Sequence, residues 1–230
     1  MALTDYRLIS FACFGTLIDR DSGVVAGLRP LLARSARPPL RDEVIAAFDR
    51  HERETITAMP GARYSAVLAA THRRLADEWR VLCTDDDDAL FARSVDDWPP
   101  YPDAAGALQY LMRYAGVALL SNAEGRTLES ISRRLDLRFD LLLSAEDAGG
   151  VQPRGRSFEP LQRRARKLGI GPAQVLHVAA SLPHDPASTT ATGMAWAWID
   201  RRRGGGACGV QYSFQSLAEL VRAHQNDLRG

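Results

Sequence analysis

Residues 7–20 read RLISFACFGTLIDR. The apolar run at 8–11 stops at the turn signal Gly15-Thr16, a pattern typical of a buried parallel strand that leads into a loop. In parallel sheets, ligands bind beside the carboxyl ends of the strands. The position where such a strand would present a reactive side chain is Ala12, which offers only a methyl group. The stretch therefore predicts an active-site strand without its reactive group.

Short apolar runs and amphipathic stretches alternate after this strand. Further strands are expected within 114–124, 139–149, 174–181 and 195–201, and helices over 125–137 and 156–170. This alternation predicts an α/β fold, a Rossmann-like doubly wound parallel sheet covered on both faces.

Residues 20–97 have helical periodicity and no convincing strand. We therefore expect a core of residues 1–19 and 98–230, with 20–97 as a helical cap inserted after the first strand. The run DDDD at 85–88 is interpreted as the acidic start of a helix rather than a metal site.

Composition narrows the possible partners. The net charge is +1, from 29 basic and 28 acidic residues, so nucleic acid is not an expected partner. A signal peptide is not recognisable, and the apolar runs are shorter than the ~20 residues of a membrane span, so we expect a cytoplasmic protein with no membrane partner. The three cysteines, Cys13, Cys83 and Cys208, include no C-x-x-C pair and argue against both a disulfide framework and a zinc site.

Four motifs fall at the expected strand ends: ACFGT, SNAE, GGVQP and AASLPHD. Together with FACFGTLID, the helical segment and GMAWAWIDRR, they make nearly the whole chain resemble the haloacid dehalogenase (HAD) superfamily, in its 2-haloacid dehalogenase-like branch. The resemblance implies the same α/β core, a cap domain and a site at the strand ends.

The resemblance also assigns roles by position. Members attack the substrate with an aspartate that forms a covalent ester; that position is Ala12 here. A lysine that pairs with this carboxylate is replaced by Gln152. Ser121-Asn122 match the substrate-holding motif, and the fourth motif matches at the residues Ser181, His184 and Asp185.

The two departures are physically coupled. A lysine without its buried carboxylate partner would be an uncompensated buried charge, and Gln152 removes that problem. This coupling favours a natural loss of the nucleophile. The alternative is that Gln152 is native and Ala12 alone was introduced.

The remaining positions follow from the same comparison. We expect catalytic roles for Asp185, Ser181 and Ser121, with substrate contacts from five residues: Phe14, Thr16, Asn122, His184 and Arg50. Four of these residues also have a plainer interpretation: Asp185 and His184 could serve only to shape their loop, Thr16 could cap the backbone, and Phe14 could simply pack. Arg53 competes with Arg50 for the place of the family's cap arginine.

No metal or cofactor is expected. Phosphatases of the superfamily place a second aspartate two positions after the nucleophile, and Phe14 stands there in this chain. Asp185 alone would be a poor magnesium site.

Three functions are open at this point. The first is a protein without the covalent step that binds a small organic acid or carbonyl compound, with a non-hydrolytic reaction such as cyclisation, elimination or isomerisation. The second is a 2-haloacid dehalogenase-like hydrolase seen as an Ala12 variant, and the third is a non-catalytic binding or scaffold protein. The resemblance also suggests a homodimer.

Overall fold

A computed structural model describes residues 1–151, 158–181, 191–204 and 210–230. The predicted site residues Gln152, His184 and Asp185 lie outside the described residues.

The described residues build an open six-stranded sheet in the order β3-β2-β1-β4-β5-β6, and every pair of neighbouring strands is parallel. This confirms the predicted α/β fold. β1 lies in the middle, hydrogen bonded to β2 on one edge and to β4 on the other. The strands are β1 (Leu8–Ala12), β2 (Gly116–Leu120), β3 (Leu141–Leu143), β4 (Val175–Ala179), β5 (Ala195–Ile199) and β6 (Tyr212–Phe214).

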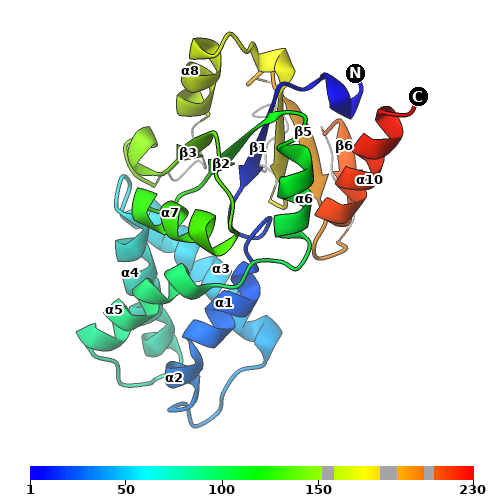
Figure 1. The fold of residues 1–230 in the computed structure, drawn as a ribbon. Coiled ribbons are helices and arrows are strands. Elements are labelled where there is room, and N and C mark those ends of the chain that lie inside the picture. The colour runs from blue at the N-terminus through cyan, green and yellow to red at the C-terminus, as the bar shows by residue number, and fades with distance from the viewer. Residues whose placement is uncertain (152–157, 182–190, 205–209) are drawn as a thin grey trace.

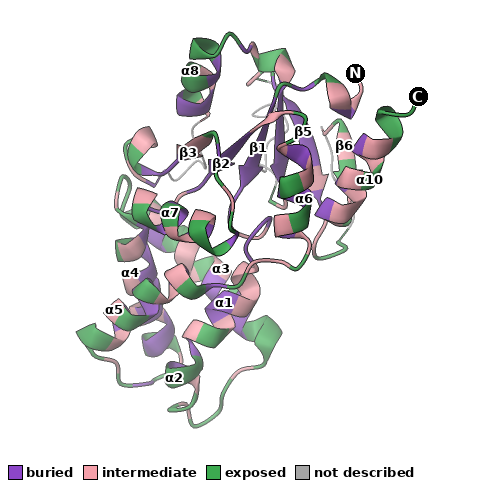
Figure 2. Ribbon diagram, in the orientation of Figure 1, coloured by how far each residue is buried: buried purple, intermediate pink, exposed green. Residues whose placement is uncertain are grey.

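Helices cover both faces of the sheet (Figure 1). Because side chains alternate along a strand, Ile9 and Phe11 of β1 face one cluster while Leu8 faces the other. The first cluster includes residues of α6 (Ala104–Leu111), α7 (Gly125–Arg134) and α10 (Leu217–Asp227); the second includes residues of α8 (Glu159–Lys167). Figure 2 shows that β1, β2, β4 and β5 and the inward sides of these helices are mostly buried. The described residues also form four short 3-10 helices: η1 (Leu3–Asp5), η2 (Ser94–Asp97), η3 (Glu146–Ala148) and η4 (Pro172–Gln174).

Residues 20–97 contain helices and no strand, as expected. They pack beyond the end of β1 (Figure 1). The acidic run at 85–88 forms the first turn of its helix, with Thr84 as N-cap, which confirms the predicted helix start. The helices are α1 (Arg20–Gly27), α2 (Arg29–Leu32), α3 (Arg41–Ala58), α4 (Tyr64–Glu78) and α5 (Asp85–Arg93). The division into two domains stays a prediction.

The chain enters and leaves the helical segment along paired backbones. The Asp19 N–H donates to the Pro99 carbonyl at 2.7 Å, and the Tyr101 N–H donates to the Leu17 carbonyl at 2.8 Å. The Asp19 carboxylate then caps α1 by accepting from the backbone and hydroxyl of Ser22. These contacts fix where the helices start relative to the loop after β1.

The helical segment also docks on the core at a second place. Gly61, in the α3–α4 turn, donates to the Val151 carbonyl at 2.9 Å, and Val151 donates back to Ala62 at 3.1 Å. Nearby, the buried Glu124 carboxylate accepts from the backbone and hydroxyl of Ser65 on α4. Two independent contacts therefore hold α4 against the loops of the core.

Sequence analysis did not identify β6 or α10. β6 has three residues at the edge of the sheet and a mixed pattern of exposure, which leaves little periodic signal. Among the described residues, no helix combines the length and the apolar character that crossing a membrane requires.

Gly23 of α1 lies directly under the Trp98 indole, and a Cβ at this position would overlap the ring. We predict that Gly23→Ala destabilises the protein by about 1–3 kcal/mol, because the buried Trp98 has to move. Urea denaturation measures this. Gly106→Ala is the matched control: this glycine of α6 has no neighbouring atom within 4 Å, and alanine should stabilise the helix by about 0.5–1 kcal/mol. Equal effects at the two sites would contradict the packing described.

Candidate functional site

The loop after β1 is a tight turn built around one carbonyl group. The Cys13 carbonyl accepts from the N–H groups of Thr16, Leu17 and Ile18 at 2.9–3.3 Å. Gly15 closes the turn with a positive φ of 78°, a conformation that glycine adopts without strain. The fully buried Ala12 methyl immediately precedes this turn.

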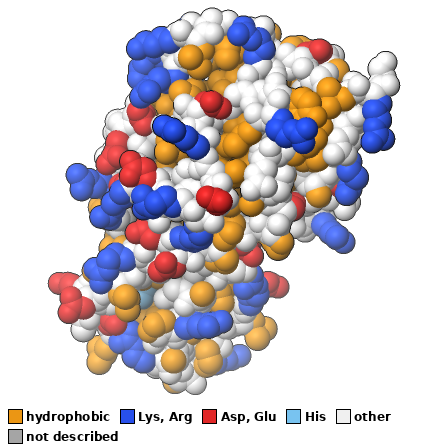
Figure 3. Space-filling view, in the orientation of Figure 1, with side chains coloured by type: hydrophobic (Ala, Val, Ile, Leu, Met, Phe, Trp, Pro, Cys, Tyr) orange, Lys and Arg blue, Asp and Glu red, His pale blue; other side chains and the backbone are white. Residues whose placement is uncertain are grey.

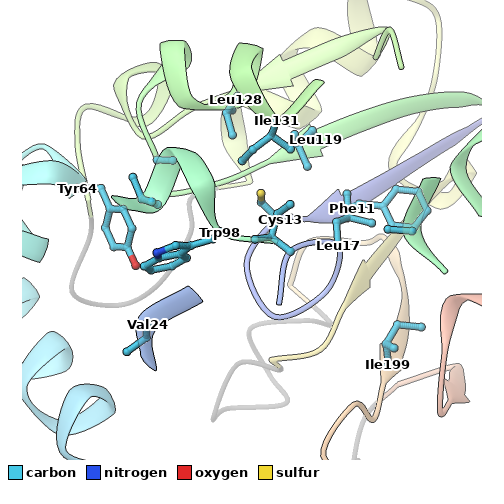
Figure 4. Close-up of a cluster of buried hydrophobic side chains, with 14 of the residues drawn as sticks. Phe11, Cys13, Leu17, Val24, Tyr64, Trp98, Leu119, Leu128, Ile131 and Ile199 are labelled. Carbon is cyan, nitrogen blue, oxygen red and sulfur yellow. The ribbon is translucent and has the colours of Figure 1, made fainter. Parts of the chain in front are cut away.

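Cys13 points to the opposite face of the sheet from Ala12. Its side chain is buried in a cluster with Leu17, Leu119 and Ile131 (Figure 4). The alternation along β1 therefore makes Cys13 part of the apolar core.

Thr16 joins the loop after β1 to the end of β4. Its Oγ1 accepts from the Ala180 N–H at 2.9 Å, and its side chain is buried. The backbone-capping role that sequence analysis left open for Thr16 is thus present in the structure. The hydroxyl proton remains available to donate to another group.

Ser121 shapes the loop after β2. Its N–H donates to the Leu143 carbonyl at 3.0 Å, and its Oγ accepts from the Ala123 N–H at 3.1 Å. Asn122 follows and is half-buried. Since β2 neighbours β1 in parallel, the loop that contains Ser121 and the loop that contains Thr16 lie side by side at the carboxyl end of the sheet.

Arg201 follows Asp200 at the end of β5 and contacts the loop after β1. Its guanidinium donates to the Thr16 carbonyl at 2.8 Å and to both oxygens of Asp103 at 2.9 Å. It also stacks over the Tyr101 ring, 4.0 Å from the centroid. Sequence analysis missed this residue, since its partners are about 100 and 185 positions away in the chain.

Phe14 packs between the core and the helical segment. Its ring stacks on Tyr64 of α4 with 5.6 Å between centroids, and meets Trp98 edge-to-face at 5.2 Å. Figure 4 shows Tyr64 and Trp98 close together at this junction. The packing role that sequence analysis considered for Phe14 is therefore observed.

A charged cluster that the sequence did not indicate lies beside this aromatic contact. Arg20 of α1 pairs with Asp49 and Glu52 of α3 at 2.7 Å each, and the Tyr64 hydroxyl donates to Glu52 at 2.5 Å. Burial, followed by the charge of Glu52, raises the pKa of Tyr64 well above its usual value, so this hydroxyl stays a donor. Burial opposes the charge of Arg20, but Glu52, Tyr64 and Asp49 outweigh it and raise the pKa of the arginine.

Arg50, the predicted cap arginine, occupies a different environment. Its guanidinium contacts Glu78 of α4 at 2.5 Å, and both side chains are more than one-third exposed. Arg20, with a side chain only 14% exposed, is far less accessible than Arg50, at 46%. The sequence pattern could not distinguish them, because burial depends on how α1, α3 and α4 pack.

The remaining predicted residues are placed in part. Ser181 follows β4 at an exposed position, one residue after Ala180. The acidic side chains described in the strand-end loops bind the protein itself: Glu124 accepts from Ser65, and Asp147 accepts from the N–H and hydroxyl of Ser144. The described part of the site therefore consists of hydroxyl groups and backbone groups around the methyl group of Ala12.

The family model for haloacid dehalogenase-like hydrolases matches residues 6–183. The chain belongs to this family. Curated proteins give no match.

Solved structures of this family share the fold. An L-2-haloacid dehalogenase superposes with a TM-score of 0.77 at 20% identity, covering 96% of this chain and 99% of its own. The L-2-haloacid dehalogenase of Xanthobacter autotrophicus with chloropropionic acid covalently bound gives 0.75 at 20% identity, covering 98% and 99%. A defluorinating L-2-haloacid dehalogenase gives 0.76 at 16% identity, covering 97% and 98%. At these identities the likeness establishes the fold.

Charged side chains of both signs are interspersed on the face shown in Figure 3. The absence of a nucleic-acid partner and the homodimer both stay predictions.

We predict that Arg201→Met destabilises this HAD-family protein by about 3 kcal/mol, because Asp103 loses a largely buried partner and Thr16 loses its carbonyl contact. Chemical denaturation gives the value. Arg163→Met is the control: its pair with Glu159 is exposed, and its loss should cost no more than about 0.5 kcal/mol. If the two variants lose the same stability, Arg201 does not brace the loop.

Proposed function

We propose that this HAD-family protein lacks the covalent nucleophile of its relatives and binds a small organic carboxylate or carbonyl compound between the strand ends and the helical segment. The observation that carries the proposal is Ala12. It stands at the carboxyl end of the central strand, where the family resemblance places the nucleophilic aspartate, and its methyl cannot attack carbon or phosphorus.

The surroundings of Ala12 support retention of a binding site. The loops after β1 and β2 begin side by side at the carboxyl end of the sheet. Thr16 bonds the first of them to Ala180 behind β4 and to Arg201, and Ser121 bonds Ala123 within the second. The hydroxyl groups of Thr16 and Ser121 each accept one backbone N–H, which leaves their protons to donate to a ligand oxygen. Donors of this kind suit a carboxylate or a polarised carbonyl.

The substrate class is suggested by the relatives. One L-2-haloacid dehalogenase of this fold carries chloropropionic acid as a covalent adduct. With Ala12 in place of the attacking carboxylate, a related acid would bind this chain without forming the ester. Gln152 fits the same change, since a lysine would lack its buried partner.

The reaction that needs fewest additional groups is an isomerisation. Asp185 would take a proton from the carbon beside a carbonyl and return it to another atom, while Ser121 and Ser181 polarise the carbonyl oxygen. The proton taken from the substrate returns to the substrate, so the reaction requires no co-reactant. An elimination would begin with the same proton abstraction, and the proton would then pass to the departing group.

The test measures binding and halide release together. The unmodified chain should bind 2-chloropropionate or lactate by isothermal titration calorimetry and release no chloride from 2-chloropropionate. Ser121→Ala should weaken binding about tenfold, since a hydrogen bond to a charged ligand is lost. Ser144→Ala is the matched control: this serine follows the neighbouring strand β3, its hydroxyl bonds Asp147, and binding should not change.

Chloride release by the unmodified chain would overturn the proposal. Release by Ala12→Asp with Gln152 retained, and not by the unmodified chain, would support the hydrolase alternative in which position 12 alone was changed from a working enzyme. Absence of binding for both acids, with an intact fold, would favour the scaffold alternative.

A further inference from the structure

A separate cluster of side chains lies within the helical segment, away from the strand ends. His72 comes from α4, Cys83 from the loop between α4 and α5, and Asp88 from α5. His72 and Asp88 are buried, and Cys83 is half-buried. The three donor atoms, Nδ1, Sγ and a carboxylate oxygen, all lie within 4.8 Å of one another.

The separations are close to those of ligands around one metal ion. His72 Nδ1 lies 2.6 Å from Asp88 Oδ1, Cys83 Sγ lies 3.1 Å from the same oxygen, and Cys83 Sγ lies 3.5 Å from His72 Nδ1. Zinc binds nitrogen and oxygen at about 2.0–2.2 Å and sulfur at about 2.3 Å. Tetrahedral nitrogen and oxygen ligands at these bond lengths lie about 3.4 Å apart, so His72 Nδ1 and Asp88 Oδ1 would separate by about 0.7 Å when an ion binds between the three atoms.

Neighbouring residues hold the three donors in place. Arg73 donates to the second oxygen of Asp88 at 2.8 Å and to the Cys83 carbonyl at 2.8 Å, so it orients both ligands from outside the cluster. The His72 ring stacks on Phe91, with 5.1 Å between centroids. Partners that orient the ligating groups in this way are typical of metal sites in proteins.

We propose that His72, Cys83 and Asp88 form a binding site for a divalent transition metal, with zinc favoured by the donor set. Imidazole, thiolate and carboxylate are zinc ligands, and three of them leave the fourth tetrahedral position to water. On binding, the Cys83 thiol gives its proton to solvent and His72 presents the lone pair of Nδ1 by keeping its proton on Nε2. The ion would link α4, α5 and the loop between them.

The site could not be recognised from the sequence. Cys83 and Asp88 follow His72 by 11 and 16 positions, which is not the paired spacing of a zinc motif. Asp88 also belongs to an acidic run that starts a helix, which already explains its presence. Sequence analysis took the three cysteines as an argument against zinc. The packing of α4 on α5 brings the three residues together, which their spacing in the sequence does not indicate.

The competing explanation is a hydrogen-bonded cluster without metal. In that case His72, Arg73 and the Cys83 thiol all donate to Asp88, which satisfies the buried carboxylate. The two explanations differ in whether Cys83 becomes a thiolate ligand, and spectroscopy detects this directly.

The experiment adds Co²⁺ and Zn²⁺ to chelator-treated full-length protein. One equivalent of Co²⁺ should give a thiolate-to-cobalt charge-transfer band in the near ultraviolet together with visible tetrahedral d–d bands, and one equivalent of Zn²⁺ should remove both. Zn²⁺ should also raise the Tm by several degrees, because the ion binds only the folded arrangement. No bands, or no displacement by zinc, would overturn the proposal.

Variants assign the site. Cys83→Ser should abolish the charge-transfer band, and Asp88→Asn should weaken Co²⁺ binding at least tenfold. Two controls should retain the bands: Asp85→Asn, a neighbouring exposed aspartate that contacts Arg73, and His51→Gln, a histidine of α3 that pairs with Glu54 and Glu78. Bands that persist in Cys83→Ser would contradict the assignment.

A measurement on the unmodified chain remains decisive if the variants do not fold. Zn²⁺ should slow alkylation of Cys83 by iodoacetamide at least tenfold, followed by mass spectrometry of its peptide. Equal alkylation rates with and without zinc would contradict the proposal. This result is independent of the strand-end site and of any ligand bound there.

Discussion

The pairing of β1 on both of its edges is the constraint on which the candidate site depends. Because β2 and β4 flank β1 in parallel, the loops that follow the three strands must emerge together. Thr16 then bonds the loop after β1 to Ala180 behind β4, and Arg201 holds Thr16 through its carbonyl. None of these contacts involves the side chain at position 12. The loop can therefore keep its shape with a methyl at the position where relatives carry a nucleophile.

The sequence predicted the core of the fold because its strands are apolar runs that end in turn or polar residues. It also identified the positions of Ala12, Thr16 and Ser121, since these follow directly from the ends of β1 and β2. It could not predict which residues of the helices turn inward. Tyr64 is buried and Arg20 is largely buried, through contacts with Asp49 and Glu52 that join three different helices. Arg50, chosen from the same amphipathic pattern, pairs with Glu78 on an exposed surface.

The helical segment is fastened to the core by groups that are separate from the proposed chemistry. Ser65 bonds the buried Glu124 behind β2, and the backbone of Gly61 pairs with Val151. The proposed metal site acts on a different part of the same segment, where it would fix α4 relative to α5. Loss of the metal would therefore loosen that helix pair, while loss of a strand-end hydroxyl would weaken ligand binding. Each proposal can fail without affecting the other.

The central claim is that no covalent ester forms at the end of β1. Intact-protein mass spectrometry after incubation with 2-chloropropionate, followed by removal of the free acid, tests it most directly. The account predicts that the mass of the unmodified chain does not change, since Ala12 offers no attacking group. A mass increase equal to one propionate ester, mapped by peptide analysis to the loops after β1, β2 or β4, would contradict it.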